Sequence, residues 1–257
     1  MAKTTATAEA ATSDIQAVAR VGQICALFGQ SAVELTAADV AERIGLNRTT
    51  AYRYCASLAA AGILDRGARR GTFVLGGLLL RLGINALAHR PVVDVAPPHL
   101  ARLRAAVSAT VVLSLWTAEG PVVALVDEDR SRTVVLTIRP GAQLDAAAAQ
   151  THVFLAHLPE ASRADWLRAH AATAERESLD AVIDEAAELG YSAVAEPRGY
   201  FAAVPVLGPA GIVATIAGLE PDPALDEAAR SAFVGELRAA AAAIGAELGA
   251  AAPGRAG

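Results

Sequence analysis

Residues 36–75 carry the pattern that most restricts how this chain can fold: helix, glycine turn, polar helix and basic hairpin follow one another directly. Thr36 is a suitable N-cap for a helix whose third residue is Asp39, a shorter relative of the capping box. Apolar residues recur at helical spacing as far as Ile44, and Gly45 supplies the left-handed residue that ends a helix. The pattern predicts a short amphipathic helix closed by a tight turn.

A second helix is predicted from Asn47, a good N-cap, to about Ala61. Its apolar stripe faces a core and comprises Ala51, Cys55, Leu58 and Ala59. Its outer face is polar and is formed by Asn47, Arg48, Thr49, Thr50, Tyr52 and Arg53. Such side chains can reach phosphates and base edges from a helix that lies in the major groove of DNA.

After Gly62, two strand-like runs flank a basic tip bracketed by Gly67 and Gly71. Arg66, Arg69 and Arg70 are expected to contact DNA phosphates. The order of elements predicts a winged helix-turn-helix. The alternative is a small helical domain whose arginines only interact with solvent.

The charge distribution favours the DNA-binding interpretation. Residues 14–90 have a balance of +4 and residues 91–257 a balance of −9, whereas the whole chain has a net charge of −5. This asymmetry predicts one module that binds a polyanion and a second module with another task.

Residues 1–13 are rich in Ala and Thr and are expected to form a disordered tail instead of a signal peptide. No run approaches the ~20 apolar residues that cross a bilayer. Cys25 and Cys55 are expected to be buried free thiols in a reducing cytoplasm, with a redox switch between them as the alternative. The sequence therefore predicts a cytoplasmic protein without a membrane partner.

Residues 76–90 predict a linker helix, and Pro91 marks a domain boundary. Its apolar face is expected at Leu79, Leu82 and Leu87, with Leu78 and Ala86 beside them. That face is too apolar for an exposed helix, so we expect it to be a dimer contact.

The remaining residues, 91–250, alternate helices and strands, and residues 251–257 are expected to form a second disordered tail. Helices are predicted at residues 92–109, 146–157, 162–170, 178–189 and 224–248, and strands at 110–118, 121–129, 132–140, 191–195, 201–207 and 212–218. The pattern predicts an α+β domain with a GAF- or PAS-like antiparallel sheet flanked by helices. Domains are thus expected at residues 14–75, 76–90 and 91–250.

Motifs typical of enzymes are missing from the sequence. There is no G-x-S-x-G, H-E-x-x-H, phosphate-loop or C-x-x-C motif. His152 and His157 lie five residues apart on a predicted helix, which rotates one by about 140° from the other, so they are poorly placed to share a metal ion. We expect neither enzymatic activity nor a metal or cofactor.

The chain resembles the IclR family of bacterial transcriptional regulators over residues of roughly 14 to 248. The resemblance is carried by SDIQAVARVGQICALF, LTAADVAERIGLNRTTAYRYCASLAAAGIL, GTFVLGGLLLRLG, FLAHLP, LGYSAV, AAVPV and GIVATIAG. It implies an N-terminal winged helix-turn-helix, a linker helix and a C-terminal effector-binding domain.

The sequence departs from the family pattern where the resemblance implies a ligand site. LDAAAAQTHVFLA stands where relatives often have a segment like LHATALGKALLA, and Thr215-Ile216-Ala217-Gly218 stands where they often have Ser-x-Ser-Gly. A retained pocket is therefore expected to be apolar and narrowed by aromatic side chains. The candidate effector-binding residues are Ser114, Trp116, Ala148, Ala149, Thr151, Glu196, Phe201, Thr215 and Ala217.

The resemblance and the residue patterns together predict a dimer, or a dimer of dimers, that binds a pseudo-palindromic double-stranded DNA operator. We expect a repressor that senses a small, largely apolar or aromatic metabolite. The alternative is a protein-interaction or ligand-binding module with a vestigial effector pocket.

Overall fold

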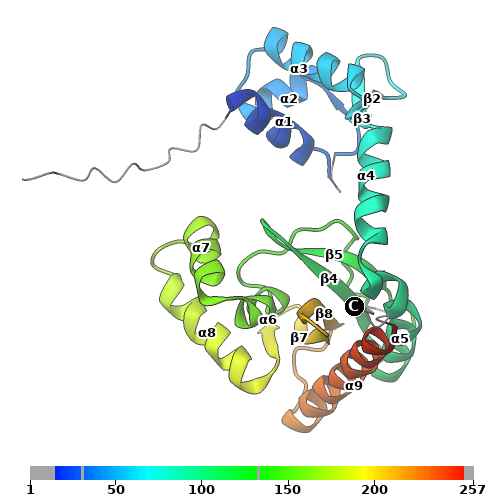
Figure 1. The fold of residues 1–257 in the computed structure, drawn as a ribbon, viewed down its shortest axis with the longest axis vertical. Helices are drawn as coiled ribbons and strands as arrows, with labels where there is room; N and C mark the ends of the chain where they lie inside the picture. The colour runs from blue at the N-terminus through cyan, green and yellow to red at the C-terminus, as the bar shows by residue number, and fades with distance from the viewer. Residues whose placement is uncertain (1–14, 30–31, 132–133, 252–257) are drawn as a thin grey trace, which may run out of the picture. The chain divides into compact units, whose positions relative to one another are not determined.

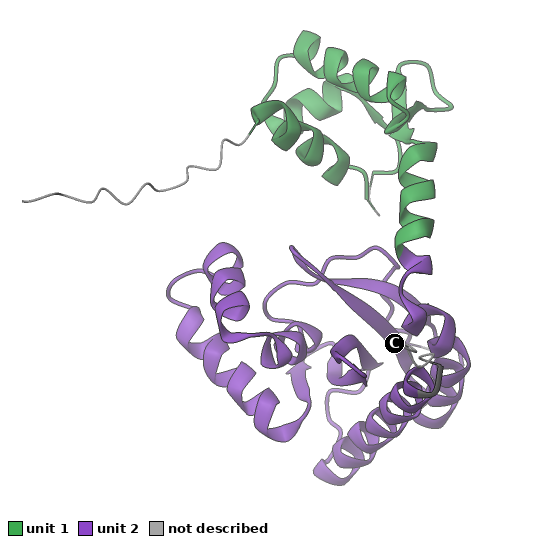
Figure 2. Cartoon of the chain, viewed as in Figure 1, with its two compact units in different colours: residues 1–86 green, residues 87–257 purple. Residues whose placement is uncertain are grey.

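A computed structural model describes residues 15–29, 32–131 and 134–251. The chain divides into two compact units, residues 1–86 and 87–257 (Figure 2). The predicted tail of residues 1–13 lies outside the described residues, as do residues 252–257 of the predicted tail at 251–257, whereas Ala251 still belongs to a helix. None of the helices in the described ranges is long and apolar enough to span a membrane.

The first unit consists of three short helices and a small antiparallel sheet (Figure 1). Its elements are α1 (Gln16–Ala26), β1 (Leu35–Thr36), α2 (Ala37–Ile44), α3 (Arg48–Ala60), β2 (Leu64–Arg66) and β3 (Thr72–Leu75), followed by α4 (Gly77–Ala88), which runs past the division between the units. The first unit therefore contains helix, turn, helix and hairpin in the order that the sequence predicts.

Local side chains define where the helices of the first unit begin and end. Thr36 Oγ1 accepts the backbone N–H of Asp39 at 3.1 Å, and Asp39 Oδ2 accepts the backbone N–H of Thr36 at 2.8 Å, which completes a capping box. Gly45 ends α2 with φ +67°. Asn47 Oδ1 accepts the N–H of Thr50 at 2.8 Å and begins α3.

The core of the first unit joins all three helices to the small sheet. Its largest fully buried side chains include Ile24, Val40, Leu64 and Phe73. Ala51, Cys55 and Leu58 are buried as the predicted stripe requires, whereas Ala59 is only half-buried. Both cysteines are free thiols, Cys55 buried and Cys25 half-buried, and burial raises the pKa of each.

The hairpin has a third strand that the sequence did not predict. The strand order is β1-β3-β2, and Leu35 pairs with Phe73. A strand of two residues is too short to show an alternating pattern in the sequence. The pairing of β1 with β3 therefore depends on how α2, which follows β1 directly, positions these two residues.

The second unit is built on a five-stranded antiparallel sheet of order β5-β4-β8-β7-β6. Its strands are β4 (Thr110–Thr117), β5 (Gly120–Asp127), β6 (Ser192–Glu196), β7 (Gly199–Gly208) and β8 (Gly211–Glu220). Its helices are α5 (Pro91–Val107), α6 (Ala149–His157), α7 (Glu160–His170), α8 (Arg176–Leu189) and α9 (Glu227–Ala251).

Helices cover both faces of this sheet (Figure 1). Leu113 and Ile216 face a core shared with α5 and α9, while Val112 and Ala217 face α6. α9 approaches closely because Gly218 has no side chain, and a Cβ there would overlap the ring of Phe233. The α+β class with an antiparallel sheet flanked by helices is confirmed.

The predicted strand at residues 132–140 is wrong for its described part. Residues 134–140 form a loop, and Val134 and Val135 are exposed. The outer edge of β5 is used by the following segment instead: Gly141 N–H donates to the Val123 carbonyl at 2.8 Å, and Leu144 N–H donates to the Pro121 carbonyl at 2.9 Å. Because these bonds occupy that edge, the apolar run before them has no strand to pair with.

The predicted apolar face of α4 is exposed at Leu82 and Leu87 but not along its whole length. Leu78 and Leu79 are half-buried, whereas Leu80, Ile84 and Leu87 are exposed at positions i, i+4 and i+7. Leu82 is exposed as well. The apolar stripe that α4 presents to solvent is therefore centred on Ile84, because Gly62 packs against the Leu78 side of the helix.

Candidate nucleic-acid interface and ligand cavity

The N-terminal half of α3 presents a polar surface to solvent. Asn47, Arg48, Thr49 and Arg53 are exposed, and Tyr52 is 51% exposed. Thr50 is half-buried. The packed face of the same helix fixes the direction of these side chains, so donors and acceptors of several kinds are displayed together by one rigid element.

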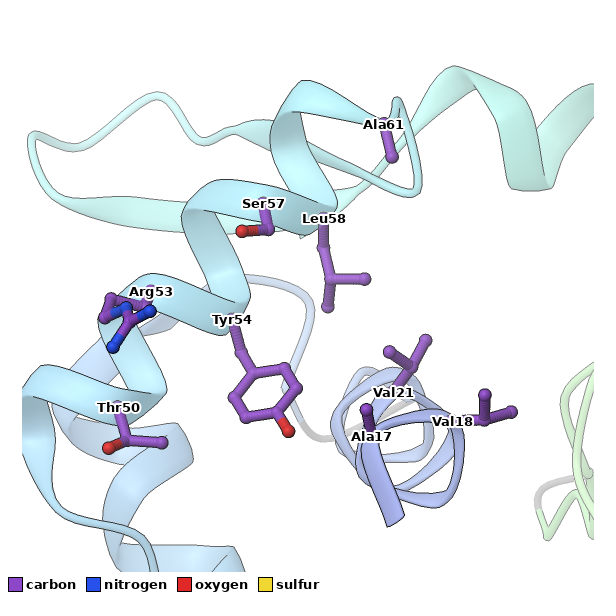
Figure 3. Close-up of a pocket in the computed structure, with 9 residues that line it drawn as sticks. All are labelled: Ala17, Val18, Val21, Thr50, Arg53, Tyr54, Ser57, Leu58 and Ala61. Atoms are coloured by element: carbon purple, nitrogen blue, oxygen red, sulfur yellow. The ribbon is translucent and has the colours of Figure 1, made fainter. Parts of the chain in front are cut away.

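A groove lies along one flank of α3, between that helix and α1 (Figure 3). Its volume is about 610 Å³. The ring of Tyr54 points across it toward Ala17 and Val21 of α1. Thr50 and Arg53 also line it, so Arg53 stands at the border between the groove and the outer face of α3.

A residue that the sequence analysis missed, Glu34, anchors the tip of the hairpin. Its carboxylate accepts the backbone N–H of Arg69 at 3.0 Å, the Nε–H of Arg69 at 3.1 Å and the hydroxyl of Thr72. The Thr72 hydroxyl, and next the Arg69 backbone N–H, lower the pKa of Glu34. Gly67 is needed because a Cβ there would overlap this carboxylate.

The three arginines predicted to contact phosphates differ in their surroundings. Arg69 is ion-paired with Glu34, and Arg66 lies over the ring of Phe73 with its guanidinium carbon 4.7 Å from the centroid. Arg70 is exposed and has no partner among the described residues. Of the three, Arg70 is therefore the one whose guanidinium has no contact with another side chain in the described part of the chain.

The second unit contains a cavity of about 380 Å³ between the sheet and the start of α6. Its floor is apolar and includes Val112, Val194 and Leu219. The loop before α6 and the β6–β7 hairpin form its rim. Five candidate effector-binding residues line it, namely Ala148, Ala149, Glu196, Phe201 and Ala217.

The structure does not place the other four candidates on the wall of this cavity. Ser114 and Thr215 are cross-strand partners that are fully buried, and neither hydroxyl has a hydrogen-bond partner among the described residues. Trp116 packs against Phe154 and Trp166 with ring centroids 5.4 and 5.7 Å away. Thr151 donates its hydroxyl to the Asp145 carbonyl at 2.6 Å and so holds the loop before α6.

Several polar residues of the cavity were not among the candidates, and Arg198 and Gln150 are two of them. Arg198 forms a 2.7 Å ion pair with Glu196 at the rim. Gln150 is 5% exposed, and its Nε2 has no hydrogen-bond partner within the described residues. A glutamine in an alanine-rich helix gives no sequence signal of its own, because its importance depends on which face of α6 is buried.

His152 connects the start of α6 to β6. Its Nε2 lies 2.9 Å from the Ala146 carbonyl, and its Nδ1 lies 3.0 Å from the Ser192 hydroxyl. Burial lowers the pKa of His152, while the Ala146 carbonyl and the charge of Asp145 act in the opposite direction. The neutral ring with its proton on Nε2 satisfies both contacts, since the carbonyl can only accept.

The described residues contain no group of three His, Cys, Asp or Glu side chains that could hold a metal ion. His152 faces Ser192 while His157 contacts the Val153 carbonyl. The two histidines of α6 thus have separate structural contacts.

Comparison with known proteins identifies relatives of this architecture. Residues 17–67 match the model of the IclR helix-turn-helix domain. No curated protein sequence matches the chain.

Solved structures match nearly the whole chain. An IclR homologue from Microbacterium hydrocarbonoxydans, solved as a complex with 4-hydroxybenzoate, is 24% identical with a TM-score of 0.75, and the match covers 91% of this chain and 100% of that one. An IclR transcriptional regulator from Silicibacter is 20% identical with a TM-score of 0.78, covering 93% and 98% of the two chains. A regulator from Alicyclobacillus acidocaldarius is 22% identical with a TM-score of 0.73, covering 92% and 100%. All three are described as IclR proteins, and none as an enzyme.

Proposed function

The chain carries an IclR helix-turn-helix domain and has the fold of IclR transcriptional regulators, and from this premise we propose that it is a dimeric repressor controlled by a small apolar or aromatic metabolite. The observation that carries the proposal is the outer face of α3. The exposed polar residues lie on one face of the helix, and the opposite face packs into the core of the first unit.

In this proposal the N-terminal half of α3 enters the major groove. Arg53 and Arg48 have the donors that recognise guanine edges, and Asn47, Thr49, Thr50 and Tyr52 supply hydrogen bonds to bases or phosphates. The hairpin arginines Arg66, Arg69 and Arg70 contact flanking phosphates, and Arg70 is the one most free to do so.

The exposed stripe of α4 supports self-association. Leu80, Ile84 and Leu87 form an apolar surface that a second copy of the chain would cover. A twofold dimer presents two copies of α3 to a pseudo-palindromic operator, as the symmetry of dimeric readers requires. Pairing of two dimers into a tetramer is compatible with the same operator geometry.

The cavity of the second unit is the proposed metabolite site. Its apolar floor and its volume of about 380 Å³ suit a molecule with a single ring. The bound 4-hydroxybenzoate in the Microbacterium homologue supports an aromatic ligand for this fold. A ligand can release DNA only if it binds the DNA-competent and DNA-incompetent arrangements with different affinities.

The proposal is tested by mobility shifts with the DNA upstream of the protein's own gene at two salt concentrations. Specific binding that weakens steeply with salt supports it. We expect Arg53→Ala to lose about 5- to 150-fold in operator affinity and to relax base preference, while Arg70→Ala weakens all sequences alike. Arg81→Ala on α4, also exposed, is the control and is expected to bind as the wild type.

If Arg53→Ala binds the operator with unchanged affinity and base preference, α3 does not read the DNA sequence as proposed. No shift with any DNA at low salt would favour the alternative, in which the first unit docks a protein and the effector pocket is vestigial.

A further inference from the structure

Strand β6 is the last strand of the five-stranded sheet, so one of its edges faces no other strand among the described residues. Its backbone hydrogen bonds within the described ranges go to β7. At the opposite side of the sheet, residues 141–144 occupy the outer edge of β5. An open edge presents unpaired N–H and carbonyl groups, and an extended segment of another chain can add to it as a further strand.

A groove of about 280 Å³ lies between β6 and one side of α9. Ala193 and Ala195 line this groove and are exposed. Side chains alternate along a strand, and Val194 and Glu196 belong to the cavity on the other face of the sheet. The groove is therefore separate from the proposed metabolite site, and its small alanine side chains leave room beside the open edge.

Two arginines of α9, Arg230 and Arg238, line the groove at positions i and i+8. The central guanidinium carbon of Arg230 lies 5.1 Å from the ring centroid of Tyr200, and that of Arg238 lies 5.1 Å from the ring centroid of Tyr191. Because a tyrosine covers one face of each guanidinium, both groups are held in place and their N–H groups remain at the edges.

Neither guanidinium has a carboxylate partner among the described residues. The Nε of Arg230 is buried without a hydrogen-bond partner there, and Arg238 donates to the Leu189 carbonyl. Glu227 also lines the groove but is exposed, and no ion pair joins it to Arg230 in the described part of the chain. Residues 91–257 have a charge balance of −9, so this pair of cations is an exception in the second unit. Their charge complements an acidic partner.

The spacing of the two arginines matches an extended chain. Residues eight apart on a helix are separated by about 12 Å along its axis. Residues i and i+4 of a β-strand point to the same side and lie about 13 Å apart. Residue i+2 of such a strand would face Val234, which lies halfway between the arginines on α9 and also lines the groove. An extended segment with acidic, apolar and acidic residues at alternate positions therefore fits this surface.

We propose that β6 and α9 form a docking groove for an extended acidic segment of a partner protein, which adds to the sheet as a sixth strand. Its backbone pairs with the open edge of β6, and two of its carboxylates, four residues apart, bind Arg230 and Arg238. The interaction is independent of the DNA and metabolite binding proposed above, because it uses neither α3 nor the cavity on the other face of the sheet.

Peptides of seven residues test the groove with the full chain. TETVTET has glutamates at its second and sixth positions, and TKTVTKT has lysines there. Two further forms of TETVTET carry N-methyl groups, either at the third and fifth positions or at the second, fourth and sixth. Fluorescence anisotropy measures the dissociation constants of the labelled peptides for the wild type and for the variants.

The variants are Arg238→Gln, Glu227→Gln and Arg168→Gln. Arg168→Gln is the matched control, because Arg168 is an exposed arginine of α7 in the same unit and its loss changes the net charge equally. The comparison of peptides on the wild type holds even if Arg238→Gln, which loses its contact with Tyr191, is less stable.

The wild type is expected to bind TETVTET at least about 10-fold more tightly than TKTVTKT. Arg238→Gln is expected to lose about 5-fold for TETVTET, the effect of one exposed charge pair. Glu227→Gln is expected to gain a few-fold, because it removes a repelling carboxylate, and Arg168→Gln to bind as the wild type does.

One of the two N-methylated peptides is expected to lose at least about 10-fold, and the other to keep its affinity. Alternate residues of a strand direct their N–H groups to opposite edges, so only one set of methyl groups blocks pairing with β6. Equal affinities for TETVTET and both N-methylated forms would overturn strand addition.

Two other outcomes contradict the proposal. An equal loss in Arg238→Gln and Arg168→Gln would show that net charge attracts the peptide and that the groove does not recognise it. If no peptide binds and Arg238→Gln changes the oligomeric state in sedimentation velocity, the groove is an interface between copies of this chain.

Discussion

Arg69 and Arg70 are neighbours in the hairpin tip and have the same formal charge, but they are not equivalent. Glu34 fixes the backbone and the guanidinium of Arg69, whereas Arg70 points to solvent without such a contact among the described residues. An exposed ion pair of this kind contributes little to stability but lowers the charge available to a phosphate. At the scale of single residues, Glu34 therefore restrains Arg69 at the hairpin tip but not its neighbour Arg70.

Replacement of Glu34 by Gln tests this restraint. The amide oxygen of Gln retains an acceptor for the hairpin tip while the ion pair with Arg69 is lost. We expect non-specific DNA affinity to rise a few-fold, and the slope of log K against log salt to become more negative by up to about 0.9, the value for one added phosphate contact. Fluorescence anisotropy over a salt series measures both.

Glu42→Gln is the matched control, because Glu42 is an exposed carboxylate of α2 in the same unit. If the two variants change DNA binding equally, the effect comes from net charge, and the restraint of Arg69 by Glu34 has no role.

His152 predicts how stability depends on pH. Burial lowers the pKa of His152 in the folded state, so the unfolded chain binds a proton more readily. The contribution of the neutral His152 side chain to the free energy of unfolding is complete above the unfolded pKa of about 6.5, and it is lost as the pH falls below that value. Urea denaturation between pH 8 and pH 5 is expected to show a smaller decrease in the free energy of unfolding for His152→Gln than for the wild type. If the free energy of unfolding falls equally in the variant and in the wild type, protonation of His152 is not the cause of the pH dependence.

At the scale of secondary-structure elements, α2 is the one that the sequence specifies most completely. Its N-cap, its third residue and its C-terminal glycine all have the predicted geometry. The segment at residues 134–140 is the opposite case, because its apolar residues suit a strand but no sheet edge is open to it. Local preference decides an element only where tertiary pairing does not compete.

Thr36→Ala removes the side-chain acceptor of the capping box. We expect a loss of about 1 kcal/mol in the free energy of unfolding of the first unit, the usual effect of removing an N-cap hydroxyl. Chemical denaturation of the full chain, followed by the unfolding transition of this unit, measures it. Ser57→Ala, an exposed change within α3, is the control and is expected to cause no such loss. Equal stability of the Thr36 variant and the wild type would show that Asp39 alone suffices.

At the scale of the whole molecule, the division into two units agrees with the charge asymmetry of the sequence. The basic first part contains the candidate DNA-binding surface, and the acidic second part contains the cavity. α4 carries an exposed apolar stripe at the end of the first unit. In the proposed function, this stripe joins two copies of the chain.

Ile84→Glu places a charge at the centre of that stripe. We expect the variant to shift from dimer to monomer at micromolar concentration and to lose at least about 10-fold in affinity for a two-half-site operator. Binding to a single half-site is expected to stay unchanged, because α3 is untouched. Sedimentation velocity and mobility shifts measure the two effects. A variant that remains dimeric would exclude α4 as the main contact.

The sequence alone determined the order of helix, turn, helix and hairpin in the first unit, the ends of α2 and α3, the polar face of α3 and the class of the second unit. These features arise from caps, turns and apolar spacing, which act over a few residues and are therefore legible in a single chain. Only the tertiary structure decided that Glu34 binds a hairpin 35 residues away, that β1 pairs with β3, and that Gln150 lies on the cavity wall. Those contacts depend on which distant segments pack together, and packing is a property of the whole fold.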